Sequence, residues 1–255
     1  MTATRFHILP DGRRIAYRFT PGADGIGGLT LVFLPGYMSD MAGSKAQAVF
    51  DWAVAHGRAC LLLDYSGCGE SPGDFADATL SRWCREVVAL VEAVCPGPVV
   101  LIGSSMGGWL MLLCALLLPA KWHAGLIGIA PAPDFTDWGY DEEQKAVLRA
   151  GATVFEHNAY GPEPTPTYPE LWADGQNLLM LHGNIMLDCP VRLLHGQADP
   201  DVPHEVSLSL AAALHSAQVQ ITLIKDGDHR LSRPADIALI LRAVEELAAT
   251  NLGTG

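Results

Sequence analysis

The fold is decided by the stretch Val99-Val100-Leu101-Ile102-Gly103-Ser104-Ser105-Met106-Gly107-Gly108-Trp109. A short apolar run leads into two glycines that flank a serine, and a second apolar run follows. The spacing Gly-x-Ser-x-Gly fits Ser105 alone, because Ser104 would need glycines at positions 102 and 106. Such a serine lies on a strained turn between a strand and a helix, where side chains two residues away would collide. We therefore predict that Ser105 is a nucleophile at a helix N-terminus, although a plain glycine-rich turn with a capping serine would share the pattern.

Apolar runs and helix-like segments alternate on both sides of Ser105. The apolar runs are uninterrupted, as expected of parallel strands that are covered on both faces, and they span residues 29–34, 59–63, 99–102, 126–129, 191–194 and 220–224. The helix candidates span residues 40–56, 79–94, 105–118, 204–215 and 234–249. This alternation predicts an α/β fold with a doubly wound, mainly parallel sheet. Phe6–Leu9 and Ile15–Phe19 flank a turn signal and should add an antiparallel hairpin at one edge.

Residues 138–187 break this alternation because they contain no clear buried strand. They include the stiff, turn-rich stretch Gly161-Pro162-Glu163-Pro164-Thr165-Pro166 and many aromatic side chains. We expect an inserted cap of helices and loops over the strand ends, with residues 1–137 and 188–255 forming the core domain. Trp138, Tyr140 and Trp172 are expected to contact the substrate, although packing of the cap onto the core would use the same side chains.

The composition restricts what the chain can bind. It has 255 residues, of which 49% are hydrophobic, and a formal net charge of -12. An acidic surface does not favour nucleic acid or anionic membranes, both of which attract Lys and Arg. The longest apolar run, Trp109–Leu118, is about half of what a bilayer requires, so no membrane insertion is expected. The expected partner is a small-molecule or acylated substrate, and the oligomeric state stays open.

The six cysteines contain no Cys-x-x-Cys pair and predict no zinc or redox motif. Cys60 and Cys114 lie in apolar runs, so we expect them to be core residues rather than disulfide partners. The opening Met1-Thr2-Ala3-Thr4-Arg5-Phe6-His7 is too short and too polar for a signal peptide. These features predict a reducing, cytoplasmic compartment.

A serine nucleophile needs a histidine to accept its proton and an acid to orient that histidine. His229 follows the last apolar run and should lie at the carboxyl end of a strand, where the sites of α/β sheets form. Asp199 lies in the loop after residues 191–194 and is the predicted acid. Asp201 is the alternative acid, but it could instead cap a nearby helix. The predicted catalytic triad is Ser105, Asp199 and His229, while His195 should pack or cap a turn.

An oxyanion hole needs two backbone N–H groups that face the tetrahedral intermediate. Met106 follows the nucleophile and should supply the first of them. Tyr37 should supply the second, from the loop Leu34-Pro35-Gly36-Tyr37-Met38-Ser39, because Gly36 would let the chain turn sharply there. A plain turn at the exit of a strand would have the same composition.

Together these features resemble the α/β-hydrolase superfamily across essentially the whole chain. Asp64-Tyr65-Ser66-Gly67-Cys68-Gly69-Glu70-Ser71 looks like the D-x-x-G-x-G-x-S turn of that family, which supports the fold without taking part in chemistry. A closer resemblance rests on Leu34–Met41, Gly43–Ala46 and Asp64–Gly67. In these segments the chain resembles the subgroup of mitochondrial palmitoyl-protein thioesterases and acyl-glucuronide esterases, together with its bacterial relatives. Pro35-Gly36 stands where most of the superfamily has His-Gly, and this departure points toward the subgroup.

The resemblance implies hydrolysis of an acyl thioester or ester through an acyl-enzyme on Ser105. This chemistry requires no metal and no organic cofactor. Within the same fold, the bond could instead belong to an acyl-glucuronide, a lactone or an amide. A non-catalytic ligand-binding protein on this scaffold is a further alternative, because a fold does not fix a function. That alternative predicts a damaged triad, whereas all three members are present.

Overall fold

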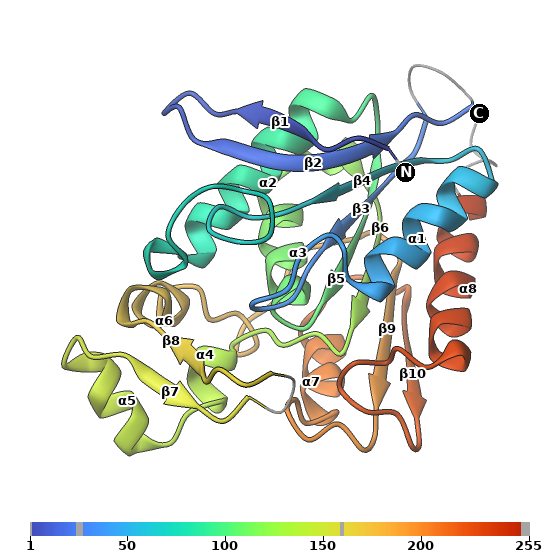
Figure 1. Cartoon of the computed structure of the whole chain (residues 1–255). Coiled ribbons are helices and arrows are strands. Elements are labelled where there is room, and N and C mark those ends of the chain that lie inside the picture. The colour runs from blue at the N-terminus through green and yellow to red at the C-terminus, as the bar shows by residue number, and fades with distance from the viewer. Residues whose placement is uncertain (1, 24–27, 159–160, 251–255) are drawn as a thin grey trace.

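A computed structural model describes residues 2–23, 28–158 and 161–250 of the chain (Figure 1). Its central sheet has the strand order β1-β2-β4-β3-β5-β6-β9-β10. β1 and β2 form the hairpin at one edge, β2 is also antiparallel to β4, and the other neighbours are parallel. The predicted α/β fold with a mainly parallel sheet is therefore confirmed. The strands span Arg5–Ile8 (β1), Arg14–Thr20 (β2), Thr30–Leu34 (β3), Ala59–Leu63 (β4), Val99–Ser104 (β5), His123–Ile129 (β6), Val191–Gly196 (β9) and Val219–Ile224 (β10).

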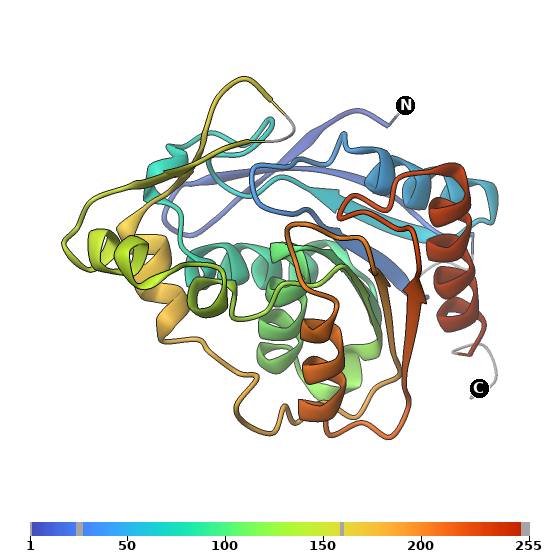
Figure 2. The same ribbon diagram turned by 90° about the horizontal axis from the view of Figure 1, so that it is seen from below.

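Helices cover both faces of this sheet: α1 and α8 lie on one face, and α2, α3 and α7 lie on the other (Figure 2). Val99 and Leu101 of β5 pack in the core cluster of α2 and α3, whereas Val100 and Ile102 pack in that of α1 and α8. Because both faces of the strand are buried, its sequence is apolar without interruption. The helices span Ser44–Ala55 (α1), Leu80–Val94 (α2), Met106–Leu117 (α3), Glu205–Ala213 (α7) and Pro234–Thr250 (α8), and two 3-10 helices span Phe75–Asp77 and Ala120–Trp122.

Residues 138–187, called the cap segment below, lie beyond the carboxyl ends of the strands, at the lower left of Figure 1. The expectation of helices and loops alone was wrong, because β7 and β8 pair as a small antiparallel sheet. Each has only three residues, too few for alternation to mark a strand, and β8 contains Pro166, which an edge strand tolerates. The first helix, α4, begins three residues before the expected boundary. The elements here span Phe135–Trp138 (α4), Glu142–Arg149 (α5), Val154–Glu156 (β7), Thr165–Thr167 (β8) and Pro169–Gln176 (α6).

Two further features bear on the environment of the chain. Within the described ranges, no helix combines the length and the apolar character that a membrane crossing requires. All six cysteines are buried free thiols, so the prediction that Cys60 and Cys114 are core residues is confirmed.

Candidate active site

Ser105 occupies the turn between β5 and α3 in a strained conformation, with φ 55° and ψ -123°. The flanking glycines are required by close backbone contacts. A Cβ on Gly103 would lie 2.2 Å from the carbonyl oxygen of Gly107, and a Cβ on Gly107 would lie 2.2 Å from that of Leu34. The glycine pair therefore has the steric role that the sequence predicted.

Ser105, His229 and Asp199 come together at the carboxyl end of the sheet. His229 Nε2 lies 3.0 Å from Ser105 Oγ, and His229 Nδ1 lies 2.8 Å from Asp199 Oδ2. Ser105 is the N-cap residue directly before α3, Asp199 follows β9, and His229 follows β10. Three separate loops thus form one chain of hydrogen bonds from a hydroxyl to a carboxylate, which is the arrangement that activates a serine.

The carboxylate in this chain belongs to Asp199 and not to Asp201. The Asp199 side chain is fully buried, and its Oδ1 accepts hydrogen bonds of 2.9 Å from the N–H groups of Asp201 and Val202. Burial alone would raise the pKa of Asp199, but hydrogen bonds from His195 and His229 outweigh burial and hold this pKa well below its ordinary value. The acid therefore stays ionised across the neutral range.

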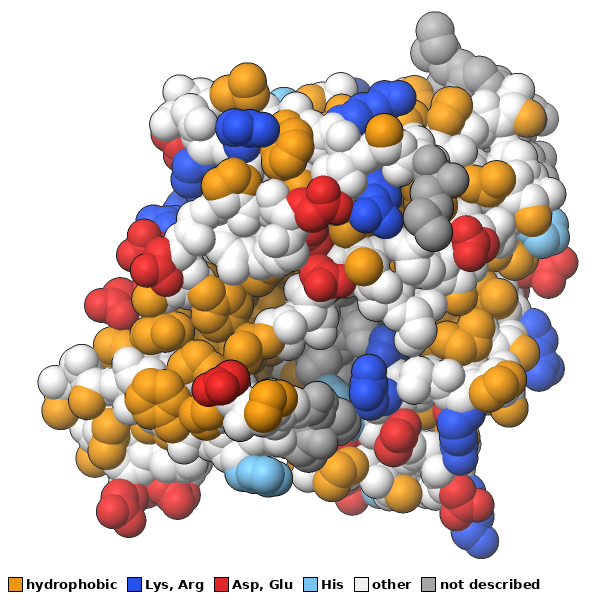
Figure 3. Space-filling view, in the orientation of Figure 1, with side chains coloured by type: hydrophobic (Ala, Val, Ile, Leu, Met, Phe, Trp, Pro, Cys, Tyr) orange, Lys and Arg blue, Asp and Glu red, His pale blue; other side chains and the backbone are white. Residues whose placement is uncertain are grey.

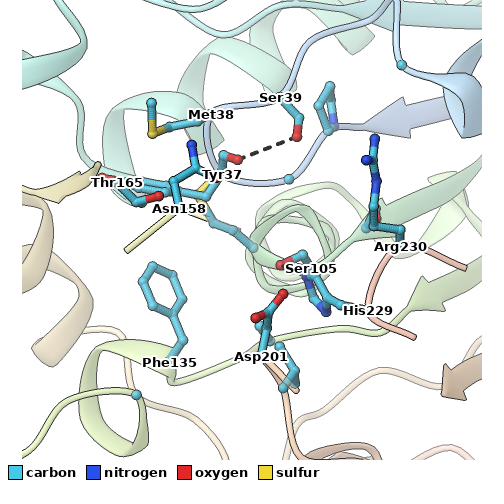
Figure 4. Close-up of a pocket in the computed structure, with 18 of the residues that line it drawn as sticks. Tyr37, Met38, Ser39, Ser105, Phe135, Asn158, Thr165, Asp201, His229 and Arg230 are labelled. Carbon is cyan, nitrogen blue, oxygen red and sulfur yellow. Dashed lines mark hydrogen bonds between the residues drawn. The ribbon is translucent and has the colours of Figure 1, made fainter. Parts of the chain in front are cut away.

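Asp201 is exposed and lines the cavity beside His229 (Figure 4). It does not cap α7, because the N-cap residue of that helix is His204. Asp199, Asp201 and His229 each offer a ligand atom within 4.8 Å of the others, a spacing at which a cation could be held. Asp199 and His229 are instead joined by a direct hydrogen bond, so the geometry favours the proton-transfer arrangement.

The loop after β3 lies against the nucleophile, and both Tyr37 and Met106 line the cavity. Among the described residues, neither backbone N–H donates to a protein acceptor. The chain turns at Gly36 as expected, with the Ser39 N–H donating to the Gly36 carbonyl at 3.1 Å, but the positive φ of this turn, 52°, belongs to Met38. Gly36 is needed for close approach instead, because a Cβ there would lie 3.3 Å from Cβ of Ser105.

Hydrogen bonds from two directions hold this loop. On the core side, the buried Asp64 carboxylate accepts from the N–H of Met41 at 2.7 Å, and the Tyr65 hydroxyl donates to the carbonyl of Pro35 at 3.0 Å. On the cap side, the Tyr37 hydroxyl donates to the carbonyl of Pro166 in β8 at 2.8 Å. The loop therefore connects the core to the cap segment.

A cavity of about 770 Å³ opens above Ser105 between the core and the cap segment. Of the three side chains expected to contact the substrate, Trp138 and Tyr140 line this cavity, whereas Trp172 does not and packs in the core of the cap segment with Tyr140. Sequence reasoning missed other lining residues, among them Met38, Lys45, Phe135, Asn158, Thr165 and Arg230. Met38 and Arg230 carried a signal, because each directly follows a predicted site residue in the sequence, Tyr37 and His229 respectively.

The two ends of this cavity differ in character. Tyr37 and Phe135 lie on one side of Ser105, and Arg230 lies on the other (Figure 4). Lys45 Nζ donates to the carbonyl oxygen of Arg230 at 2.5 Å. Burial, together with the charge of Arg230, lowers the pKa of Lys45 to about 8, so the ammonium is still mostly charged at neutral pH. The surface view shows hydrophobic side chains gathered over the cap side and Lys or Arg side chains beside the hollow (Figure 3).

The fold agrees with what comparison with known proteins finds. Residues 31–240 match the alpha/beta hydrolase family, and the chain belongs to that family. Mitochondrial palmitoyl-protein thioesterase ABHD10 of Mus musculus is 39% identical over 222 residues, which cover 85% of this chain and 74% of that protein. The structure of a putative hydrolase from Agrobacterium vitis S4 has a TM-score of 0.88 and 37% identity, covering 96% of this chain and 99% of that chain. Alpha/beta hydrolase domain-containing protein 10 from mouse also has a TM-score of 0.88, with 33% identity and coverage of 98% and 99%. The predicted resemblance to this subgroup is therefore confirmed.

Proposed function

We propose that this alpha/beta hydrolase is a serine hydrolase that cleaves carboxylic esters or thioesters through an acyl-enzyme on Ser105. The observation that carries the proposal is the unbroken line of hydrogen bonds from Ser105 Oγ through His229 to Asp199, with distances of 3.0 and 2.8 Å. The name of the mouse relative, a palmitoyl-protein thioesterase, supports an acyl thioester as one substrate. The expected partner is therefore a small or acylated substrate.

The proposed reaction has two halves. His229 Nε2 takes the proton of Ser105 as Oγ bonds to the acyl carbon, and the carbonyl electron pair moves onto oxygen, where it faces the N–H groups of Tyr37 and Met106. The bond to the alcohol or thiol then breaks, and His229 protonates that leaving group. In the second half a water molecule gives its proton to His229 and attacks the acyl-enzyme, which releases the acid and restores Ser105.

We further propose that residues 138–187 act as a substrate-binding cap on a core formed by residues 1–137 and 188–255. Tyr140 and Trp138 from this segment line the cavity, and Tyr37 of the core is hydrogen-bonded to its strand β8. The cap segment also has a small core of its own, in which Tyr140, Leu148, Val154 and Trp172 pack together. These contacts favour an acyl group bound between the two parts.

The direct test is Ser105→Ala. We expect this variant to lose hydrolysis of p-nitrophenyl esters and labelling by a fluorophosphonate probe, because no other nucleophile is hydrogen-bonded to His229 in the described residues. Ser104→Ala is the matched control, since this neighbouring serine does not fit the Gly-x-Ser-x-Gly spacing and should leave labelling intact. Labelling that persists in Ser105→Ala and disappears in Ser104→Ala would overturn the proposal.

An acyl-glucuronide is a second candidate substrate, and the pair of Lys45 and Arg230 beside the cavity favours it. The protein is acidic as a whole, but these two cations line one end of its cavity. There they would attract a leaving group that carries a carboxylate. Lys45→Gln should then raise KM for an acyl-glucuronide and leave KM for its methyl ester nearly unchanged. An equal effect on the acid and on its methyl ester would argue against this substrate.

The compartment remains a prediction. The sequence indicates a cytoplasmic enzyme, whereas the mouse relative carries the word mitochondrial in its name. Fractionation of the cells that produce the chain distinguishes the two compartments.

A further inference from the structure

A second histidine contacts the proposed catalytic acid. His195, the fifth residue of β9, is completely buried. Its Nδ1 lies 2.7 Å from Ser207 Oγ, and its Nε2 lies 3.0 Å from the carbonyl oxygen of Val202 and 3.3 Å from Asp199 Oδ2. His229 Nδ1 lies 2.8 Å from that same Oδ2. Two imidazoles therefore share one carboxylate oxygen, and only one of them reaches Ser105.

The partners of His195 fix its tautomer. The Val202 carbonyl can only accept a hydrogen bond, so His195 Nε2 must carry a hydrogen. In the neutral imidazole Nδ1 is then an acceptor, and the Ser207 hydroxyl donates to it. This Nε2 lies 3.0 Å from the carbonyl oxygen of Val202 and 3.3 Å from Oδ2 of Asp199, so its hydrogen lies close to the carboxylate as well as to the carbonyl. His195 thus presents a fixed donor to the acid.

This donor matters electrostatically because the Asp199 carboxylate is fully buried. Burial would raise the pKa of Asp199, and the hydrogen bond from His195 is the largest influence that lowers it, ahead of the one from His229. A carboxylate that accepts an additional N–H shares its charge with that donor. Its attraction for the proton on His229 is correspondingly weaker.

We propose that His195 is a positioning residue that sets the orientation of the Asp199 carboxylate and moderates its pull on His229. The inference rests on the proposed function, because it assigns His195 a part in that same triad. With the donor present, His229 is held in line with Ser105 and still releases its proton to a leaving group. Without the donor, Asp199 turns more freely and binds the proton of His229 more strongly.

If the role of His195 were merely structural, its hydrogen bond to Val202 would only stabilise the turn from Asp199 to Val202. The pH profile of kcat/KM separates the two roles, because its acid limb reports protonation of the free enzyme's base. Other charged groups around His229 include Asp201 and Lys45, which line the same cavity, and Asp228 and Arg230, its neighbours in sequence. They stay unchanged in each variant, so their influence cancels in the comparison.

The test compares His195→Phe, which keeps a ring but removes both nitrogens, with His195→Gln, whose amide N–H can reach the position of Nε2. For His195→Phe we expect kcat to fall about 10- to 100-fold, the range found when groups that are hydrogen-bonded to metal-binding histidines are mutated. Its acid limb should move to higher pH by about half a unit, the equivalent of one ordinary hydrogen bond. His195→Gln should recover most of kcat and return the acid limb toward the wild-type position.

His215→Phe is the matched control, because this exposed histidine contacts Asp188 rather than Asp199. It should leave both kcat and the pH profile unchanged. If His195→Phe does not fold, His195→Asn replaces it, since the shorter amide does not reach Oδ2. An acid limb that stays in place or moves to lower pH, or a Gln variant no better than Phe or Asn, would overturn the role of His195. Failure of the proposed function is recognised separately, by hydrolysis that survives Ser105→Ala.

Discussion

At the scale of single residues, Asp199 and Asp201 both bring a carboxylate close to the His229 ring, and Asp199 is the one built into the hydrogen-bonded chain. Asp199 is buried and directly bonded to His229, whereas Asp201 is exposed in the cavity. Asp199→Asn should lower kcat by about 10⁴-fold, because an amide stabilises neither the correct tautomer nor the imidazolium. Asp201→Asn is the matched change and should have a much smaller effect. Steady-state hydrolysis of one p-nitrophenyl ester gives kcat for both variants. A larger loss of kcat in Asp201→Asn than in Asp199→Asn would assign the role of the acid to Asp201.

A second residue-scale prediction concerns Lys45 and pH. Burial and the charge of Arg230 lower the pKa of Lys45 from 10.5 to about 8. In the folded enzyme the ammonium is therefore charged below pH 8 and neutral above it. If Lys45 binds an anionic leaving group, the preference for an acyl-glucuronide over its methyl ester should decline between pH 7 and pH 9, roughly one unit on either side of this pKa. The ratio of the kcat/KM values for the two substrates measures this preference. In Lys45→Gln the ratio should be low and should not change with pH.

At the scale of elements, the position of Ser105 depends on how closely α3 approaches β3. A Cβ on Gly107 would lie 2.2 Å from the carbonyl oxygen of Leu34 and 2.5 Å from that of Pro35. Gly107→Ala should therefore lower the free energy of unfolding by about 3 kcal/mol or more, since two backbone segments must move apart. Gly183→Ala is the control, because its nearest atom would lie 3.9 Å away. Urea unfolding compares the two variants, and equal midpoints would contradict this account.

The contact between the loop after β3 and strand β8 gives the second element-scale prediction. Tyr37→Phe removes the hydroxyl that donates to Pro166 but keeps the backbone N–H proposed for the oxyanion hole. A hydrogen bond of this kind contributes about 1 kcal/mol, so kcat/KM should fall about fivefold to tenfold if the cap segment helps to hold the loop. Tyr17→Phe, at the far edge of the sheet in β2, is the control. A Tyr37→Phe variant with unchanged kcat/KM would show that the loop is held by the core alone.

At the scale of the whole molecule, the sequence predicted those elements whose apolar pattern is long enough to recognise. The apolar runs found β4 at its observed bounds, 59–63, and the other central strands within one to three residues at either end. The meeting of Ser105, Asp199 and His229 followed from chain order and from the shared edge of parallel strands. The strands β7 and β8 were too short to leave a periodic signal. Lys45 and Phe135 enter the cavity only through the packing of distant segments, which no local pattern encodes.

The whole molecule also gives Ser105 two different surroundings, an aromatic side next to the cap segment and a cationic side at Lys45 and Arg230. For an acyl chain bound on the aromatic side, the free energy of binding becomes more favourable with each methylene that is buried. We therefore expect kcat/KM for p-nitrophenyl esters and for thioesters to rise about threefold to fourfold per methylene until the cavity is filled. A chain-length series from acetyl to palmitoyl, run with both kinds of ester, measures this gain and shows which leaving atom is preferred.

The same series tests which side of the cavity holds the acyl chain. Phe135 lines the cavity and its ring contacts those of Tyr37 and Trp109, so Phe135→Ala should reduce the gain for long chains and leave acetyl esters almost unaffected. Phe155→Ala is the matched control, because this phenylalanine of β7 is 64% exposed and does not line the cavity. If both variants lose the same activity at every chain length, the chain does not bind beside Phe135. Rate constants that fall with chain length in the wild type would instead indicate an esterase for short acyl groups, with the aromatic residues serving only to pack the cap segment.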